Sequence, residues 1–279
     1  MANFHSDEWI MARLAEHYEE AKQHFDESRI VGIFIQGSQN YGLDYEGSDI
    51  DTKLIVAPTF EEIAFNKKPV STTHVRENNE HIDFKDIRLY IETFRKQNLN
   101  FLEILFTPYK IVNPRYAEWW NKLVENREAI AHYDIHKAIK SMKGIALEKY
   151  HAMEHKYPSK VDIIEKYGYD SKQLHHLLRV EEYLLRYIEG ESYAECLIPN
   201  SARIQKLKNI KENNGLLSLE EARKTANIAL KNIEMMCEEG LAYYPEGYDP
   251  EVEKLLKEVQ YDIMKFAIAV ELVEEEYYD

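Results

Sequence analysis

The chain has few residues of the kinds that cross-link or interrupt a fold. Of its 279 residues, 10 are glycines, 8 are prolines and 2 are cysteines, Cys196 and Cys237. So few cysteines exclude a disulfide framework, and they exclude a zinc site built from four cysteines or from a close cysteine pair plus a histidine pair. From this cysteine usage we expect a cytoplasmic protein. A chain of this length can bury a large hydrophobic core, and we expect this core to hold the fold together.

Long apolar runs and an excess of positive charge are also missing. No stretch of about 18 apolar residues is present, and the first residues, MANFHSDEWIMARLAEHYEE, carry acids instead of the apolar segment of a signal peptide. We expect no interaction with a membrane. The 35 Lys and Arg residues stand against 50 Asp and Glu residues, a formal net charge of −15. This balance excludes sequence-blind coating of DNA by a basic surface, but it is compatible with a local basic groove.

The first part of the chain has the pattern of a mixed fold. Residues 6–27 are predicted to form a helix with Ser6 as its N-cap, and the β-branched run from Ile30 to Gly37 is predicted to form a buried strand. The segment DIDTKLIVA alternates with period two and predicts a second strand. Further short strands are predicted in STTHV and EHIDF, followed by a helix over residues 85–97.

Beyond Pro108 and Pro114 the pattern is almost entirely helical, with apolar stripes over residues 174–188 and 252–270. We therefore predict an α+β fold of two domains. Residues 1–112 would form a small sheet flanked by helices, and residues 113–279 would form an all-helical domain.

The residues with the clearest chemical meaning are Gly37 and Ser38, followed ten residues later by Asp49-Ile50-Asp51. In a strand, Asp49 and Asp51 would project to the same side, and two carboxylates held together need a cation. Such hard oxygen ligands suit Mg²⁺, with Mn²⁺ as the alternative ion. Gly37 and Ser38 end the preceding strand, where free backbone N–H groups and a hydroxyl can receive a phosphate.

A third carboxylate would complete a two-metal site. Asp83, in the predicted strand HIDF, is the preferred candidate, and Asp86 is the rival. Two other interpretations of the acidic segment are a calcium loop and a plain surface turn. The calcium template fails because the sixth position counted from Asp44, where it requires glycine, is Asp49.

Together, Gly37, Ser38, Asp49, Asp51 and the later Asp83 resemble the signature of the DNA polymerase β-like nucleotidyltransferase superfamily. Within it, GSQNYGLDYEGSDIDTKLI is similar to a branch of predicted nucleotidyltransferases associated with RNA-repair systems, as are NLNFLEILFTP and YGYDSKQLHHLLRV. The resemblance implies Mg²⁺-dependent transfer of a nucleoside monophosphate from an NTP, such as ATP, to a hydroxyl acceptor, with release of pyrophosphate. It favours an RNA end, such as that of tRNA, as the acceptor, and a helical domain that closes over the nucleotide.

The same resemblance implies that Lys172 and Arg179 contact nucleotide phosphates. They lie two helical turns apart on one face of a predicted helix. The alternatives are a solvated Lys172 and an ion pair of Arg179 with Glu181, Glu182 or another acid. For the whole protein, the alternatives are a transferase that modifies a small molecule or a protein, and a nucleotide-binding sensor without catalytic activity.

Overall fold

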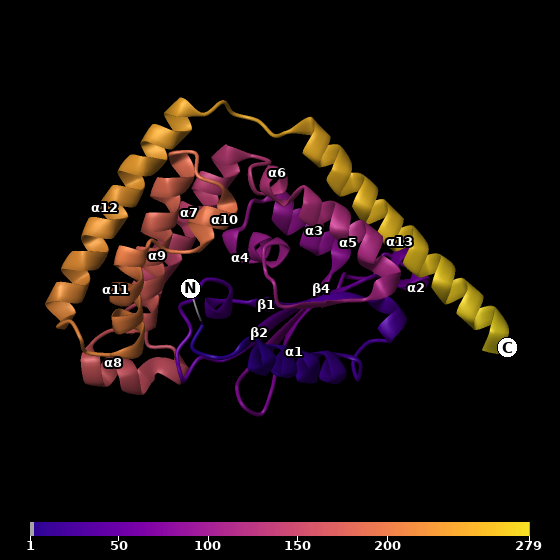
Figure 1. Ribbon diagram of the computed structural model, residues 1–279, viewed down its shortest axis with the longest axis horizontal. Coiled ribbons are helices and arrows are strands. Elements are labelled where there is room, and N and C mark those ends of the chain that lie inside the picture. Colours follow the sequence, from indigo (N-terminus) through magenta and orange to yellow (C-terminus); the bar gives the residue numbers. More distant parts are fainter. Residues whose placement is uncertain (1–2, 279) are drawn as a thin grey trace. The chain divides into compact units, whose positions relative to one another are not determined.

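The computed structural model of the chain describes residues 3–278, and side chains up to residue 273. It contains two compact units. The first comprises Met1–Asn40, Glu46–Tyr133 and Tyr248–Asp279, and contains the sheet (Figure 1). The second comprises Tyr41–Tyr45 and Asp134–Gly247, and its elements are helices. The predicted class, a small sheet flanked by helices together with a helical domain, is confirmed.

The boundary between the two units does not fall at residue 112, where the sequence predicts it. Strand β5 (Lys110–Val112) pairs with β1 (Ile30–Gln36), and helix α5 (Ala117–Glu125) places Trp120 4.2 Å from Phe34 of that strand, measured between ring centroids. Helix α13 (Pro250–Tyr278) belongs to the same unit, with Phe266 5.2 Å from Trp119. Hydrophobic period reports only local structure, so it could not show that the last helix returns to the sheet-containing unit.

The sheet has five strands in the order β3-β4-β2-β1-β5. Besides β1 and β5, its strands are β2 (Asp51–Val56), β3 (Ser71–Val75) and β4 (His81–Asp86). Strands β2 and β4 are parallel, and the other pairs are antiparallel. The four strands predicted from the sequence are all present, and the parallel pair places β4 directly beside the strand that begins with Asp51.

Helix α1 (Asp7–Ala21) covers one face of the sheet. Ser6 caps it as predicted, because its side chain accepts a hydrogen bond from the backbone N–H of Trp9 at 3.2 Å. The buried side chains of Ile10 and Leu14 on this helix pack with alternate residues of the strands, among them Ile33 and Leu54. This core fixes which residues of β2 and β4 point away from α1.

Helix α3 (Ile87–Arg95), like α5, packs against α13. The remaining helices in this unit are α2 (Phe60–Ala64), α4 (Leu99–Leu102) and α6 (Arg127–Ala131).

The helical unit is built around α9 (Ser171–Ile188), whose predicted apolar stripe is buried except for Leu185, which is exposed, and Ile188, which is half-buried. Its other helices are α7 (Ile135–Ala152), α8 (Val161–Tyr167), α10 (Tyr193–Leu197), α11 (Ser201–Glu212) and α12 (Leu219–Tyr243).

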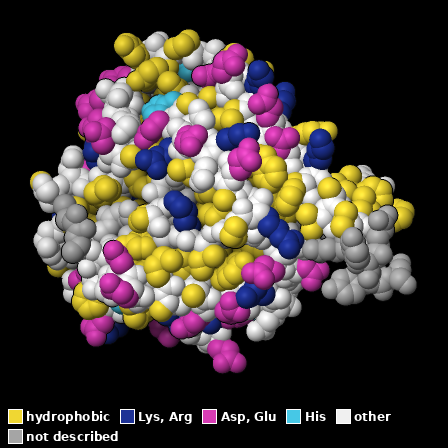
Figure 2. Space-filling view, turned by 45° about the vertical axis from the view of Figure 1, so that its right-hand side comes forward, with side chains coloured by type: hydrophobic (Ala, Val, Ile, Leu, Met, Phe, Trp, Pro, Cys, Tyr) yellow, Lys and Arg dark blue, Asp and Glu magenta, His cyan; other side chains and the backbone are white. Residues whose placement is uncertain are grey.

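Within residues 3–278, none of the helices has the combination of length and apolar character that crossing a bilayer requires. On the face shown in Figure 2, basic side chains are interspersed with acidic ones and do not gather into one patch.

Candidate functional site

Two of the predicted site segments meet at one edge of the sheet. Gln36, the last residue of β1, lies opposite Asp51, the first residue of β2. The turn that contains Gly37 and Ser38 therefore begins where the segment Asp49-Ile50-Asp51 enters the sheet. A buried side chain also joins the two segments, because Gln39 Nε2 donates a hydrogen bond to the backbone oxygen of Asp49 at 3.0 Å.

Asp49 lies in the irregular segment before β2, and not in the strand as the sequence predicts. Its side chain is exposed, whereas Ile50 is fully buried in the core beneath α1. Asp51 is half-exposed and accepts a hydrogen bond from His81 Nδ1 at 3.0 Å. The backbone N–H of Ile50 donates to the carboxylate of Glu80 at 3.3 Å. The buried side chain of Ile50 thus fixes the acidic segment to the core, and Asp49 and Asp51 flank Ile50 in the sequence.

Gly37 shapes the turn after β1. Its φ of +101° lies in a region that other residues rarely adopt, while an added Cβ would meet only Gln39 Oε1, at 3.9 Å. Conformation, and not lack of space, therefore requires glycine. The Gly37 N–H donates to Glu103 Oε1 at 2.5 Å, so it is not free to receive a phosphate as the sequence predicts. Ser38 begins the next turn, and its hydroxyl has no hydrogen-bond partner among the residues that the structure describes.

Residues that the sequence prediction missed hold this turn in place. Glu103 is 2% exposed and also accepts from Asn40 Nδ2 at 2.6 Å. Asn40 in turn accepts from the Thr107 hydroxyl at 2.6 Å. The signal for Glu103 was a single acid inside the apolar run FLEILF, since a charged residue in such a run needs a specific partner.

Asp83 lies on β4 directly opposite Lys53 of β2, two residues beyond Asp51. Lys53 Nζ is 2.9 Å from Asp83 Oδ2 and 4.0 Å from the centroid of the Phe101 ring. Burial lowers the pKa of the Lys53 ammonium, and the charge of Asp83 opposes that shift. In this structure the carboxylate predicted as a third metal ligand is an ion-pair partner of Lys53.

The rival, Asp86, has a structural role. Its fully buried carboxylate caps α3 by accepting the backbone N–H of Arg88 at 2.8 Å, and it also forms an ion pair with the Arg88 guanidinium at 2.6 Å. Between the two candidates, Asp83 is the one with a partly exposed side chain. The geometry therefore favours Asp83 over Asp86 for any role that requires contact with a ligand.

The carboxylates of Asp49 and Asp51 offer hard oxygen donors of the kind Mg²⁺ prefers. Among the described residues, no group of three or more His, Cys, Asp or Glu side chains is placed to hold a metal ion by itself. Magnesium commonly binds one or two carboxylates together with substrate phosphates. The residues present therefore fit an ion bound jointly with a phosphate ligand.

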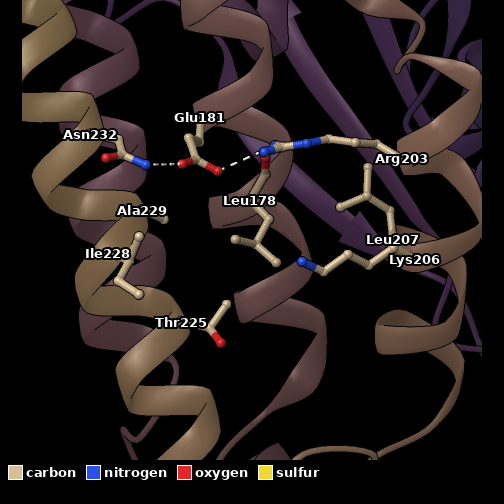
Figure 3. A pocket seen from close by; sticks show the side chains of 9 residues that line it. All are labelled: Leu178, Glu181, Arg203, Lys206, Leu207, Thr225, Ile228, Ala229 and Asn232. Atoms are coloured by element: carbon tan, nitrogen blue, oxygen red, sulfur yellow. Dashed lines mark hydrogen bonds and ion pairs between the residues drawn. The ribbon is translucent and has the colours of Figure 1, made fainter.

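In the helical unit, Arg179 is a buried cation without a hydrogen-bonded counterion. Its side chain is 6% exposed, and its Nε and Nη2 have no hydrogen-bond partner within the described part of the chain. Its Cζ lies 3.6 Å from the centroid of the Tyr41 ring. The alternative of an ion pair is not what the structure shows, because Glu181 binds Arg203 and Asn232 (Figure 3), and Glu182 binds the backbone N–H of Asn200.

Two further cations belong to the surroundings of Arg179. Lys172 is exposed at the start of α9, where Asp170 caps the helix. Lys211 is buried and donates to the backbone oxygen of Leu43 at 2.9 Å. Burial, followed by the charge of Lys172, lowers the pKa of Lys211 to about 8. The buried carboxylate of Asp44 offsets part of the positive charge at Lys211. Three cations near one another, two of them buried, still favour an anionic ligand.

His175 and His176, adjacent on α9, belong to no group of three or more potential metal ligands among the described residues. His175 is buried, and its Nδ1 lies 2.9 Å from the backbone oxygen of Leu207. Burial lowers the pKa of His175 to about 3, so this ring is neutral at physiological pH.

No family model matches this chain, and no curated protein matches it. Among solved structures, the chain is similar to a crystal structure described as a nucleotidyltransferase-like protein from Exiguobacterium sibiricum 255-15. The similarity covers 82% of this chain and 75% of that chain, with 12% sequence identity and a TM-score of 0.27. A likeness this weak adds nothing to what the residues themselves support.

Proposed function

We propose that the chain is a Mg²⁺-dependent nucleotidyltransferase that moves a nucleoside monophosphate from an NTP to a hydroxyl acceptor and releases pyrophosphate. The observation that carries the proposal is the meeting of the Gly37-Ser38 turn with the acidic segment at one edge of the sheet. A donor for phosphate oxygens and a pair of carboxylates for a divalent ion are then combined in one small region.

Each residue at this edge has a distinct task in the proposal. Asp49 and Asp51 would hold Mg²⁺, which supplies charge neutralisation for the triphosphate and activation of the attacking hydroxyl. Gly37 gives the turn its conformation, and the Ser38 hydroxyl donates to a phosphate oxygen. Glu103 keeps the turn in place through the Gly37 N–H. Catalysis then depends mainly on positioning and on charge.

Asp83 is proposed as a further metal ligand or as the base for the acceptor hydroxyl, and this role requires it to exchange its contact with Lys53. Lys172 and Arg179 of the helical unit are proposed to bind phosphate oxygens. Support for Arg179 comes from its buried guanidinium, which gains a hydrogen-bonded anion when a phosphate binds.

For the acceptor we propose an RNA end, such as that of a tRNA, because the sequence is similar to the RNA-repair branch. The net charge of −15 argues against a long basic track for RNA, so few phosphates of the acceptor would be contacted. We also propose that the protein is cytoplasmic.

The second candidate function is transfer of the nucleoside monophosphate to a small molecule or a protein.

The acceptor is identified by incubating the protein with Mg²⁺ and each α-labelled NTP, in turn with bulk tRNA, with a mixture of small hydroxyl compounds, and alone. Label that enters tRNA supports the RNA acceptor, and label that enters small molecules or the protein itself supports the second candidate. If no acceptor is labelled although NTP binds, the catalytic proposal is wrong and a nucleotide sensor replaces it.

A further inference from the structure

Strand β3 lies at one edge of the sheet, and among the described residues its neighbour in the sheet is β4 alone. The backbone N–H of Arg76 donates to the Glu80 oxygen at 2.9 Å, and the N–H of Asp86 donates to the Val70 oxygen at 2.9 Å. In an antiparallel pair, residues that bond to the partner strand alternate with residues that do not. The even-numbered residues from 70 to 76 therefore bond to β4, and the odd-numbered residues of β3 direct their N–H and C=O groups away from the sheet.

The outward-facing residues of β3 are Ser71, Thr73 and Val75. All three are exposed, and their backbone groups make no hydrogen bond to another segment in the described part of the chain. Proteins usually protect such an edge with a proline, a lysine, a bulge or a covering segment. The five residues of β3, STTHV, contain no proline or lysine, and their register with β4 is continuous. This edge can therefore accept another strand.

The outward-facing residues are complementary to those of a second copy in antiparallel orientation. When Thr73 of one copy lies opposite Thr73 of the other, Ser71 of each copy lies opposite Val75 of the other, so every outward-facing residue is paired. Each of these pairs can exchange two backbone hydrogen bonds, and threonines that face each other across two strands add a favourable contact. A register shifted by two residues leaves the residue at one end of the row without a partner in the strand.

The residues that flank β3 carry opposite charges at its two ends. Lys67 and Lys68 precede the strand, Glu77 follows it, and all three are exposed. Antiparallel pairing places the basic end of each strand beside the acidic end of the other, which is favourable. We propose that two copies of this chain associate through β3, in an antiparallel pairing centred on Thr73 that joins the two five-stranded sheets into one. The association requires no nucleotide and is independent of the activity proposed above.

Cysteine cross-linking tests the pairing and its register together. Opposite Cα atoms in a hydrogen-bonded antiparallel pair are about 5.5 Å apart, a separation that suits a disulfide. Thr73→Cys should therefore convert mostly to a covalent dimer under mild oxidation and return to the monomer on reduction. The matched control is Thr72→Cys, an exposed neighbour that would lie opposite His74 of the second copy and should stay monomeric. Cys196 and Cys237 are buried, so the wild-type protein should not cross-link.

Sedimentation of the full chain without nucleotide measures the association itself, at physiological salt because each copy carries a net charge of −15. One strand per copy is a small interface, so we expect a weak dimer, seen as an average mass that rises between about 5 and 200 µM protein. Thr73→Pro removes one outward N–H and keeps the bonds to β4, so this variant should fold and stay monomeric.

The cross-linking result decides the case in which Thr73→Pro does not fold. The proposal is overturned if the wild-type protein stays monomeric at about 200 µM, if Thr73→Pro associates like the wild-type protein, or if Thr72→Cys cross-links as readily as Thr73→Cys.

Discussion

Lys53 and Asp83 lie directly opposite each other on the parallel strands β2 and β4, with 2.9 Å between Lys53 Nζ and Asp83 Oδ2. The lysine side chain is only 6% exposed, and its charge is stabilised mainly by this carboxylate, with a smaller contribution from Glu103. Asp83 therefore stabilises the sheet whether or not it also contacts a metal ion. These two roles can be separated by experiment.

Asp83→Asn should lower the free energy of unfolding by about 3 kcal/mol, because it takes away the carboxylate that is hydrogen-bonded to the buried Lys53 ammonium. The double variant Lys53→Met/Asp83→Asn removes both charges and should recover most of that loss. Urea unfolding of the single and double variants measures both effects. Wild-type stability in Asp83→Asn would show that the ion pair contributes nothing. Wild-type pyrophosphate release in the double variant would exclude a catalytic role for Asp83.

Glu80 links α1 to the acidic segment and should make the protein sensitive to acid. Burial raises the pKa of the Glu80 carboxyl, but hydrogen bonds from His17, Asn78 and Arg13 outweigh burial and lower this pKa to about 2. Since this pKa lies below the unfolded value of 4.5, its contribution is fully present above pH 4.5 and is lost as the pH falls toward 2.

The contribution corresponds to roughly 3 kcal/mol, because the folded and unfolded pKa values of Glu80 differ by about 2.5. Glu80→Gln should therefore be less stable than the wild-type protein at pH 7, and the difference should shrink as the pH falls below 4.5. Chemical unfolding at a series of pH values measures this. A difference that stays constant with pH would contradict the assignment.

Gly37→Ala tests whether the turn after β1 needs its unusual backbone conformation. With φ at +101°, the substitution should cost about 1 to 2 kcal/mol of stability and weaken NTP binding. Gly144→Ala is the matched control, because Gly144 lies in α7 with nothing within 4 Å of an added Cβ. That variant should gain roughly 0.5 to 1 kcal/mol. Equal melting temperatures for the two variants would be incompatible with a constrained turn at Gly37.

Arg179→Met should raise stability and lower NTP affinity at the same time. Removing a buried guanidinium without a hydrogen-bonded counterion should stabilise the unliganded protein by about 1 kcal/mol or more, while losing a phosphate contact should weaken NTP binding roughly tenfold. Thermal unfolding and nucleotide titration are measured on the same samples. Arg223→Met, at an exposed ion pair with Glu154, serves as the control and should change neither. A loss of stability in Arg179→Met would contradict this account, because it would show that the contact with the Tyr41 ring outweighs the cost of burying the charge.

Local features of the fold could be predicted from the sequence, and relationships across the chain could not. Ser6 as a cap and the β-branched run of β1 are local signals, and both predictions are confirmed. The pairing of Asp83 with Lys53 depends on strand register, which hydrophobic period does not report. The same is true of Glu103, whose partner Gly37 lies 66 residues away in the sequence.

Within the candidate site, the sequence predicted the turn and the acidic segment but not their exact structure. Ile50 is buried in the core and β2 begins only at Asp51, so Asp49 lies in the irregular segment before the strand. An alternating pattern cannot show where hydrogen-bonded pairing starts. The metal ligands and the phosphate contacts remain predictions.

The most direct measurement is pyrophosphate release with Mg²⁺ and each NTP, with and without bulk tRNA, for the wild-type protein and for Asp49→Ala/Asp51→Ala. The matched control is Glu46→Ala/Glu77→Ala, which removes two exposed acids from the same unit. We predict tRNA-dependent release from one NTP in the wild-type and control proteins, and none in the Asp49/Asp51 variant although it remains folded. Release that is unchanged in the Asp49/Asp51 variant, or absent from the wild-type protein with every NTP, would contradict the proposed nucleotidyltransferase activity.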